Sequence, residues 1–243
     1  MNEFNEIDIL GIPFAKVTTK ETLAIMENWL KSDKNHVVAT PNPEGVMQAK
    51  RNIKFKTALL NADMRLADGI GITLGAKYKG TPLPERVRGV DTTFALFQSL
   101  CNKNQSFTVY FLGGKPGVAK NAKKLMEAKY PAMKVAGYHH GFFKENSQEE
   151  TKILAEINNI MPDILLVCTG MPRAEIWATT HKNLKTKITL CVGGTIDIMG
   201  GNVKIAPAFM RKIGLEWLYR LITQPSRFVR MLDIPRFMLA IVK

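Results

Sequence analysis

The chain has 243 residues, of which 46% are hydrophobic and 23% are charged, a composition that excludes a disordered protein. Its formal net charge of +13 indicates an anionic partner, and no apolar run reaches the roughly 20 residues that a membrane-spanning helix requires. The cysteines Cys101, Cys168 and Cys191 show no CxxC spacing, so we expect free thiols in a reducing compartment. The acidic N-terminus does not resemble a secretory signal, and we expect a cytoplasmic protein.

The body alternates apolar runs typical of strands with amphipathic stretches typical of helices. It begins with a hairpin over 7–17 and a helix that starts at a capping box, Thr18 to Glu21. The further strands are expected at 36–40, 64–68, 107–113, 134–140, 163–170 and 188–194. After a loop at 41–45 come one or two helices to residue 61, and the later helices are expected at 71–79, 91–101, up to 130, 147–160 and 172–183.

This alternation predicts an α/β fold, with a Rossmann-like, mainly parallel sheet covered by helices on both faces. Residues 1–203 would form this core, and residues 204–243 a helical C-terminal appendage.

Polar residues and glycines gather where the predicted strands end. Thr40 precedes Pro-Asn-Pro-Glu-Gly, Asp68 precedes Gly-Ile-Gly, and two other strands run into the turns at 113–117 and 169–172. Because the carboxyl ends of parallel strands share one edge, we expect Asp68 and Thr40 in one crevice with these turns, whose backbone N–H groups could hold phosphate. The alternative that Asp68 only caps the following helix stays open.

The C-terminal appendage is basic and amphipathic, with eight lysines and arginines against two acids, a net charge of +6. A helix is expected over 209–222, and Arg227 and Arg230 are expected on a shared face beyond Pro225. Aromatic residues stand among these charges: Trp217, Tyr219, Phe228 and Phe237. The combination favours docking on an anionic membrane surface, with a solvated surface helix as the alternative.

Seven stretches then follow one another in a fixed order: TPNPEGV, ADGIGI, ERVRGVD, FLGGKPGVA, GMPRAEIW, VGGTIDIMGG and GLEWLYRL with QPSR. On these residues the chain resembles the WecG/TagA/CpsF glycosyltransferase family from end to end, and its TagA branch most. The resemblance implies an inverting, metal-independent transfer of N-acetylmannosamine from UDP-N-acetylmannosamine to the 4-hydroxyl of N-acetylglucosamine on undecaprenyl diphosphate, which makes the linkage unit of wall teichoic acid. It implies no cofactor and a peripheral position on the inner face of the cell membrane. UDP-N-acetylmannosaminuronic acid is the alternative donor.

The resemblance also assigns roles to residues. It places the general base at Asp68 with Thr40 in the same pocket, and an ordinary aspartate pKa of about 3.9 would keep that base ionised at neutral pH. Arginines are expected to receive the charge of the departing diphosphate, and the candidates are Arg220, Arg227 and Arg230, with Arg86 nearby. The other candidates for the nucleotide-sugar pocket are Asn42, Arg88, Gly114, Gly170, Glu175 and Asp197.

Two positions depart from the family pattern: Ala174 stands where glutamine is usual and Ile205 where arginine is usual. Each replacement removes a long polar side chain from its loop.

The four histidines show no metal-ligand spacing, so no metal site is expected. A nicotinamide-dependent Rossmann oxidoreductase is the first rival class, although GxGxxG is missing, and a nucleic-acid-binding module is ranked last. Packing of the appendage on the body, on a membrane or in a homo-oligomer is left open.

Overall fold

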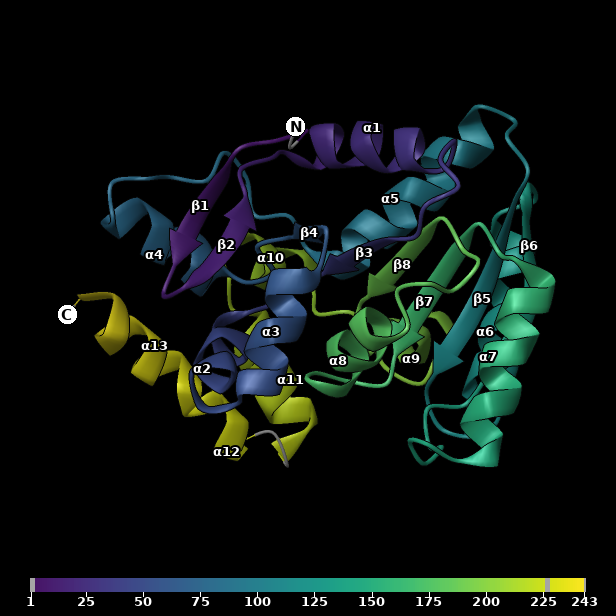
Figure 1. Cartoon of the computed structure of the whole chain (residues 1–243). Helices are drawn as coiled ribbons and strands as arrows, with labels where there is room; N and C mark the ends of the chain where they lie inside the picture. The colour runs from purple at the N-terminus through teal and green to yellow at the C-terminus, as the bar shows by residue number, and fades with distance from the viewer. Residues whose placement is uncertain (1–2, 226–227, 243) are drawn as a thin grey trace.

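Six parallel strands form the central sheet of the computed structural model, which describes residues 3–225 and 228–242 (Figure 1). The strand order is β4-β3-β8-β7-β5-β6, and every neighbouring pair is parallel. These strands are β3 (His36–Ala39), β4 (Met64–Arg65), β5 (Phe107–Gly113), β6 (Met133–His139), β7 (Ile164–Cys168) and β8 (Ile188–Cys191). A separate antiparallel hairpin joins β1 (Glu6–Ile9) to β2 (Ile12–Ala15). The predicted hairpin and mainly parallel sheet are confirmed.

The inner strands are apolar on both sides because helices cover both faces of the sheet. Along β5, Val109 and Phe111 contribute to one hydrophobic core, whereas Tyr110 and Leu112 contribute to the other. The first core also takes residues from α1 (Thr19–Trp29), α5 (Gly89–Asn102), α6 (Val118–Lys129) and α9 (Thr195–Met199). The second core takes residues from α2 (Pro43–Arg51), α3 (Ile53–Asn61), α4 (Ile70–Tyr78), α7 (Gln148–Ile160) and α8 (Arg173–Thr180).

Local sequence sets where the early helices begin. Thr18 starts α1 with the predicted capping box, which the structure confirms. The predicted loop over 41–45 is wrong in its second half, because α2 already begins at Pro43. Asn42 Oδ1 accepts a hydrogen bond from Gly45 N at 2.9 Å, and a proline in the first turn sacrifices no helical hydrogen bond.

The strand predicted over 64–68 is shorter in the structure and ends at Arg65. Leu66 N still donates to the Ala39 carbonyl of β3 at 2.9 Å. Beyond this point Asp68 N donates to the Pro41 carbonyl at 3.3 Å, but Pro41 has no N–H to return a bond, so the regular ladder is not continued. The last residue of the predicted strand therefore lies in the loop before α4.

The C-terminal appendage forms several short helices: α10 (Ala208–Lys212), α11 (Glu216–Thr223), α12 (Phe228–Met231) and α13 (Asp233–Val242). The single helix predicted over 209–222 is wrong. Gly214 has φ +80°, and a Cβ at this position would lie 2.7 Å from Ile70 Cδ1, so the chain turns here between α10 and α11. Arg227 lies outside the described residues, and the shared face expected for it and Arg230 is not described.

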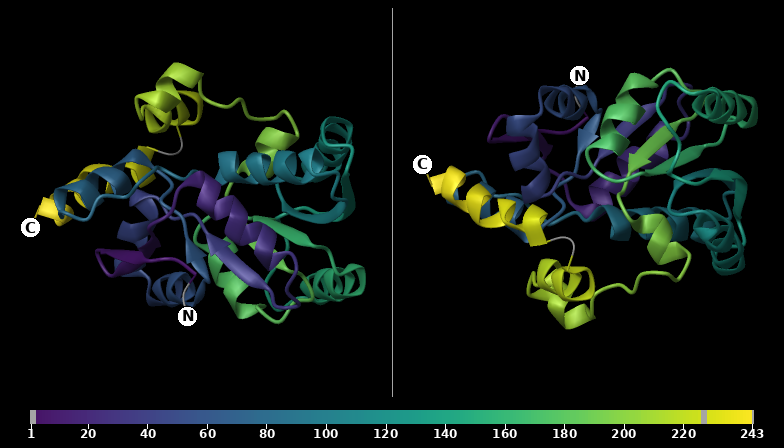
Figure 2. Two further views of the ribbon diagram at one scale, coloured as in Figure 1. Left: turned by 90° about the horizontal axis from the view of Figure 1, so that it is seen from above. Right: turned by 90° about the horizontal axis from the view of Figure 1, so that it is seen from below.

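The last helix returns to the body with α12 at its start, whereas α10 and α11 stand to one side of the body (Figure 2). α13 packs on α2 and α4, and Phe237 and Ile241 are buried in the second core. Its first residue, Asp233, forms an ion pair with Arg51 of α2. The expectation that Phe237 meets a membrane is wrong, because its side chain is 0% exposed. None of the described helices is long and apolar enough to cross a bilayer.

Candidate active site

A cavity of about 720 Å³ opens at the carboxyl ends of β3, β4, β7 and β8 and is bordered on its other side by α11 and α12. Its size is that of a small-molecule site. The sequence-predicted residues that line it are Thr40, Asn42, Asp68, Arg88, Gly170, Glu175, Asp197, Arg220 and Arg230. Residues far apart in the chain therefore meet at the edge where parallel α/β sheets usually bind ligands.

Asp68 lines the cavity from the loop between β4 and α4. Its Oδ2 accepts one hydrogen bond, from Gly89 N at 3.2 Å, and the side chain does not cap α4, whose first turn has no side-chain cap. Protein atoms surround the carboxyl group on most sides, although it keeps some contact with the cavity. This burial raises the pKa of Asp68, while the charge of Arg220 acts to lower it. The ordinary pKa expected from the sequence is therefore wrong, and the group is a stronger base than a free aspartate.

The first residue of α5 has to be glycine for this arrangement. A Cβ on Gly89 would lie 2.8 Å from Thr40 Cγ2, so any larger residue would push the helix away from β3. Thr40 itself donates from Oγ1 to the Cys191 carbonyl of β8 at 2.9 Å. The close approach brings the N-terminus of α5, with its partial positive charge, to the Asp68 carboxylate.

Two arginines share one acid opposite Asp68. Arg88 Nη1 donates to Glu216 Oε2 at 2.8 Å, and Arg220 pairs with Oε1 of the same carboxylate. Burial acts to raise the pKa of Glu216, but the charges of Arg220 and Arg88 hold this pKa below its ordinary value. Arg88 is also bound to Asp91 and is only 7% exposed, so it is fixed, whereas Arg220 borders the cavity with a single acidic partner among the described residues.

The other predicted arginines are placed differently. Arg230 lines the cavity from α12, with Nε 3.6 Å from Glu44 Oε2. Arg86 is not among the lining residues: its Nη2 donates to the Arg211 carbonyl at 2.6 Å and ties α10 to the body. Arg227 lies outside the described residues.

Of the glycines, Gly170 lines the cavity but Gly114 does not. The Gly114 carbonyl instead accepts a hydrogen bond from Gly141 N at 2.9 Å, which holds the ends of β5 and β6 together. The two residues that depart from the family pattern lie in different places. Ile205 lines the cavity, whereas Ala174 is 0% exposed and belongs to the second core. Only Ile205 therefore changes the cavity surface.

Sequence reasoning missed several lining residues: Lys115, Gly193, Gly194, Lys204, Glu216 and Tyr219. Lys115 and the two glycines lie in turns after strands that the sequence already showed, so their position was a usable signal. Lys204, Glu216 and Tyr219 belong to the appendage, whose path along the body has no signal in the sequence pattern. The six residues together add two positive charges, Lys115 and Lys204, and one negative charge, Glu216, to the cavity.

Glu175 is the most deeply buried acid of the cavity, with 4% of its surface exposed. Among the described residues its Oε2 has no hydrogen-bond partner. Burial raises the pKa of Glu175 to about 7, while its own backbone N–H and the charge of Arg230 act to lower it. A ligand that donates a hydrogen bond to Oε2 would relieve this unpaired carboxyl group.

Replacing Glu175 with glutamine should make the stability of the protein depend less on pH between about pH 5 and pH 8. Because the folded-state pKa lies above the ordinary 4.5, the folded chain binds the extra proton, and wild-type stability should fall as pH rises from about 4.5 to 7. Between pH 5 and pH 8 the loss from this group amounts to about 2–3 kcal/mol, and the variant lacks it. Urea unfolding at both pH values measures the difference.

Glu150 provides the matched control, because it is also 4% exposed but both of its oxygens accept hydrogen bonds, from Asn146 N and Trp177 Nε1. Glu150→Gln should lower stability at both pH values, since it breaks one of these bonds. Equal pH dependence of Glu175→Gln and wild type would show that the buried carboxyl group does not carry the shift.

Comparison with known proteins agrees with the geometry. The family model described as "Glycosyl transferase WecG/TagA/CpsF family" matches residues 7–243. The chain is 34% identical over 218 residues to a protein of Bacillus spizizenii, covering 88% of this chain and 82% of the relative. It is 30% identical to one of Bacillus subtilis strain 168 (97% and 90% covered) and 29% identical to one of Staphylococcus aureus strain MRSA252 (98% and 92% covered). All three are named N-acetylglucosaminyldiphosphoundecaprenol N-acetyl-beta-D-mannosaminyltransferase.

Proposed function

Because the chain belongs to the WecG/TagA/CpsF glycosyltransferase family, we propose that it transfers N-acetylmannosamine from UDP-N-acetylmannosamine to the 4-hydroxyl of N-acetylglucosamine on undecaprenyl diphosphate. The names of its relatives support this acceptor and this sugar. The observation that carries the proposal is the meeting of one carboxylate, Asp68, with Arg220 and Arg230 across a single cavity. A base for the acceptor and cations for the leaving diphosphate are the two requirements of the reaction.

The proposed step is a direct displacement. The acceptor 4-hydroxyl oxygen attacks the anomeric carbon from the side opposite UDP, its proton passes to an Asp68 oxygen, and the bond from the anomeric carbon to the diphosphate breaks. One bond forms as the other breaks, so the anomeric configuration is inverted. The raised pKa of Asp68 favours this proton transfer because the base accepts the proton more readily than an ordinary aspartate.

UDP leaves with an added negative charge, and the cavity offers positive groups for it. Arg220 and Arg230 border the cavity from the appendage, and Lys115 borders it from the turn after β5. Charge-assisted hydrogen bonds from these side chains could stabilise the diphosphate without a metal ion, and we propose that the reaction needs none. Glu175 would then accept a hydrogen bond from the nucleotide sugar.

We further propose that the appendage lies on the inner face of the cell membrane, where the prenyl acceptor is embedded. Residues 204–242 carry more than half of the exposed large hydrophobic side chains of the described chain, among them Phe209, Ile222 and Phe228. The same segment is rich in basic residues, and each such residue near an anionic leaflet contributes about 1 kcal/mol. Apolar and basic side chains on one segment support a peripheral, reversible attachment.

A transfer assay with the purified full-length chain tests the proposal. A short-chain prenyl-diphosphate N-acetylglucosamine is incubated with UDP-N-acetylmannosamine or UDP-N-acetylmannosaminuronic acid, each with and without EDTA. We expect a disaccharide product of inverted configuration from the first donor, formed at an unchanged rate in EDTA. Product from the second donor alone would overturn the donor assignment, and loss of activity in EDTA would overturn metal independence.

The same preparation distinguishes the rival classes. Family membership argues against a nicotinamide-dependent oxidoreductase and a nucleic-acid-binding module, and UDP should raise the melting temperature whereas NADH and duplex DNA should not. Stabilisation by NADH with none by UDP would overturn the glycosyltransferase proposal as a whole.

A further inference from the structure

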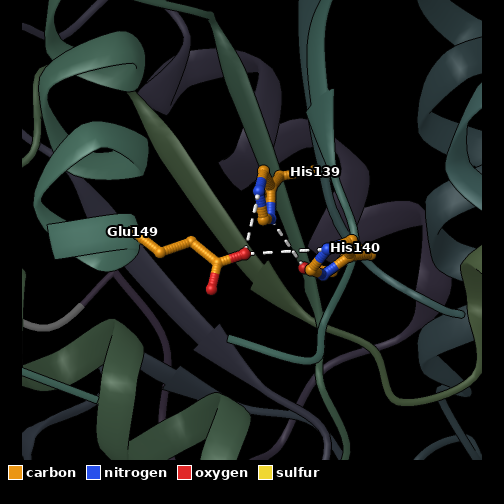
Figure 3. Close-up of side chains that lie close together, drawn as sticks. All are labelled: His139, His140 and Glu149. Atoms are coloured by element: carbon orange, nitrogen blue, oxygen red, sulfur yellow. Dashed lines mark hydrogen bonds and ion pairs between the residues drawn. The ribbon is translucent and has the colours of Figure 1, made fainter. Parts of the chain in front are cut away.

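Three metal-binding side chains converge away from the cavity, at the far edge of the sheet (Figure 3). His139 is the last residue of β6, His140 follows it, and Glu149 lies in the first turn of α7. One ligand atom from each residue lies within 4.8 Å of the other two. Neighbouring strand residues normally point to opposite faces, so both rings meet Glu149 only because β6 ends at His139.

We propose that these three residues form a binding site for a divalent transition-metal ion and that zinc is the ion that suits it best. The spacing of the ligand atoms supports it. His139 Nε2 and His140 Nε2 lie 3.5 and 3.6 Å from the same oxygen, Glu149 Oε1. These distances are too long for good hydrogen bonds. They match the roughly 3.4 Å that separates nitrogen and oxygen ligands around a tetrahedral zinc ion.

The outer hydrogen bond of the His139 ring also fits. His139 Nδ1 lies 2.9 Å from the His140 carbonyl oxygen, which can only accept, so Nε2 is the ring nitrogen left to bind an ion beside Glu149. A backbone carbonyl on the second ring nitrogen is the usual support of a zinc-bound histidine. His140 Nδ1 accepts a long hydrogen bond of 3.3 Å from Phe142 N, so metal binding through Nε2 requires the ring proton to move from Nε2 to Nδ1 and breaks that weak bond.

The site leaves room for water and has the right donors. The three side chains are between 24% and 43% exposed, so an ion could enter and complete its coordination with solvent. Two imidazoles and one carboxylate suit zinc, whereas magnesium and calcium prefer oxygen ligands alone.

A bound ion would fix the end of β6 to the start of α7. The residue after His140 is Gly141, which is joined to the turn after β5 through the Gly114 carbonyl. The site would therefore stabilise the fold beside the cavity without touching the substrate, and the inference does not depend on the proposed function.

Zinc titration of the chelator-treated, full-length chain without a histidine tag tests the site. We expect one zinc ion per chain by isothermal titration calorimetry and a rise in melting temperature of roughly 5–10 °C at a hundredfold excess over the dissociation constant. Glu149→Gln and His139→Ala should each weaken zinc binding at least about tenfold, because even outer partners of metal ligands contribute that much. Cobalt bound at the same site should show no thiolate absorption.

His181→Ala is the matched control. His181 Nε2 lies 3.5 Å from Glu150 Oε1, so it forms a histidine–glutamate pair of the same kind but with a single histidine. Zinc affinity should be unchanged in this variant. Glu149 is 43% exposed, so Glu149→Gln should stay folded even if His139→Ala does not.

Absence of stoichiometric zinc binding to the wild type would overturn the site, as would equal affinity in wild type and Glu149→Gln. The transfer assay keeps the two proposals apart, because Glu149→Gln should retain transfer and stabilisation by UDP. If the wild type binds zinc but does not transfer the sugar, the result counts against the proposed function alone.

Discussion

Asp68→Asn should lower kcat for sugar transfer by about 10²–10⁴ while UDP binding is retained. Asparagine has nearly the same shape and can still accept the hydrogen bond from Gly89 N, so the loop before α4 should keep its position. It has no basic oxygen for the acceptor proton, and the barrier to transfer rises. Single-turnover rates and calorimetric UDP binding, measured on the same preparation, separate the two effects.

Asp197→Asn is the control on the same cavity, in the first turn of α9, which follows β8. We assign Asp197 to donor binding, so its replacement should raise KM for UDP-sugar and leave kcat within a small factor. The wild type should also lose activity in acid at a higher pH than an ordinary aspartate would cause, because burial raises the pKa of Asp68. Wild-type turnover by Asp68→Asn would remove Asp68 from the mechanism.

Arg220→Gln should lower kcat by about 10²–10³, the usual loss when one fixed donor to a developing negative charge is removed. The fold should tolerate the change. Glu216, the partner of Arg220, keeps its bond to Arg88 at 2.8 Å, so no buried carboxylate is left without a cation. We expect Arg220→Gln to lower kcat much more than it lowers the affinity for UDP. Steady-state kinetics measures both effects.

Arg236→Gln is the corresponding control on α13. Arg236 pairs with Asp233 at 3.1 Å and is 57% exposed, yet it does not line the cavity. The variant removes the same charge from the same appendage, so it should bind membranes about as weakly as Arg220→Gln while keeping full turnover in detergent. Equal losses of turnover in the two variants would show that net charge, and not a contact with the diphosphate, matters.

The sheet and most of the cavity could be predicted from the sequence because both follow from local rules. Alternating apolar strands and helices predict parallel pairing, and parallel pairing places Thr40, Asp68 and Gly170 at one edge. The basic C-terminal segment pointed to Arg220 and Arg230, and the family resemblance led us to assign them to the leaving diphosphate.

The remaining features depend on contacts between distant segments. Arg86 lies in a favourable motif, but its guanidinium binds the Arg211 carbonyl of α10 instead of facing the cavity. Phe237 stands among basic residues in the sequence, and only the return of α13 to α4 shows that it belongs to the core. The raised pKa of Asp68 likewise reflects how many atoms surround it, which the order of residues does not reveal.

The return of α13 affects how deletion variants of this chain should be interpreted. Its side chains Phe237 and Ile241 contact Gly75 of α4, where a Cβ would lie only 3.1–3.3 Å away. A protein cut after residue 203 would expose that apolar surface, and its inactivity would report damaged packing as readily as a missing cover over the nucleotide. Point substitutions on α11 and α12 leave this anchor intact, and they are the proper way to examine what the appendage contributes to turnover.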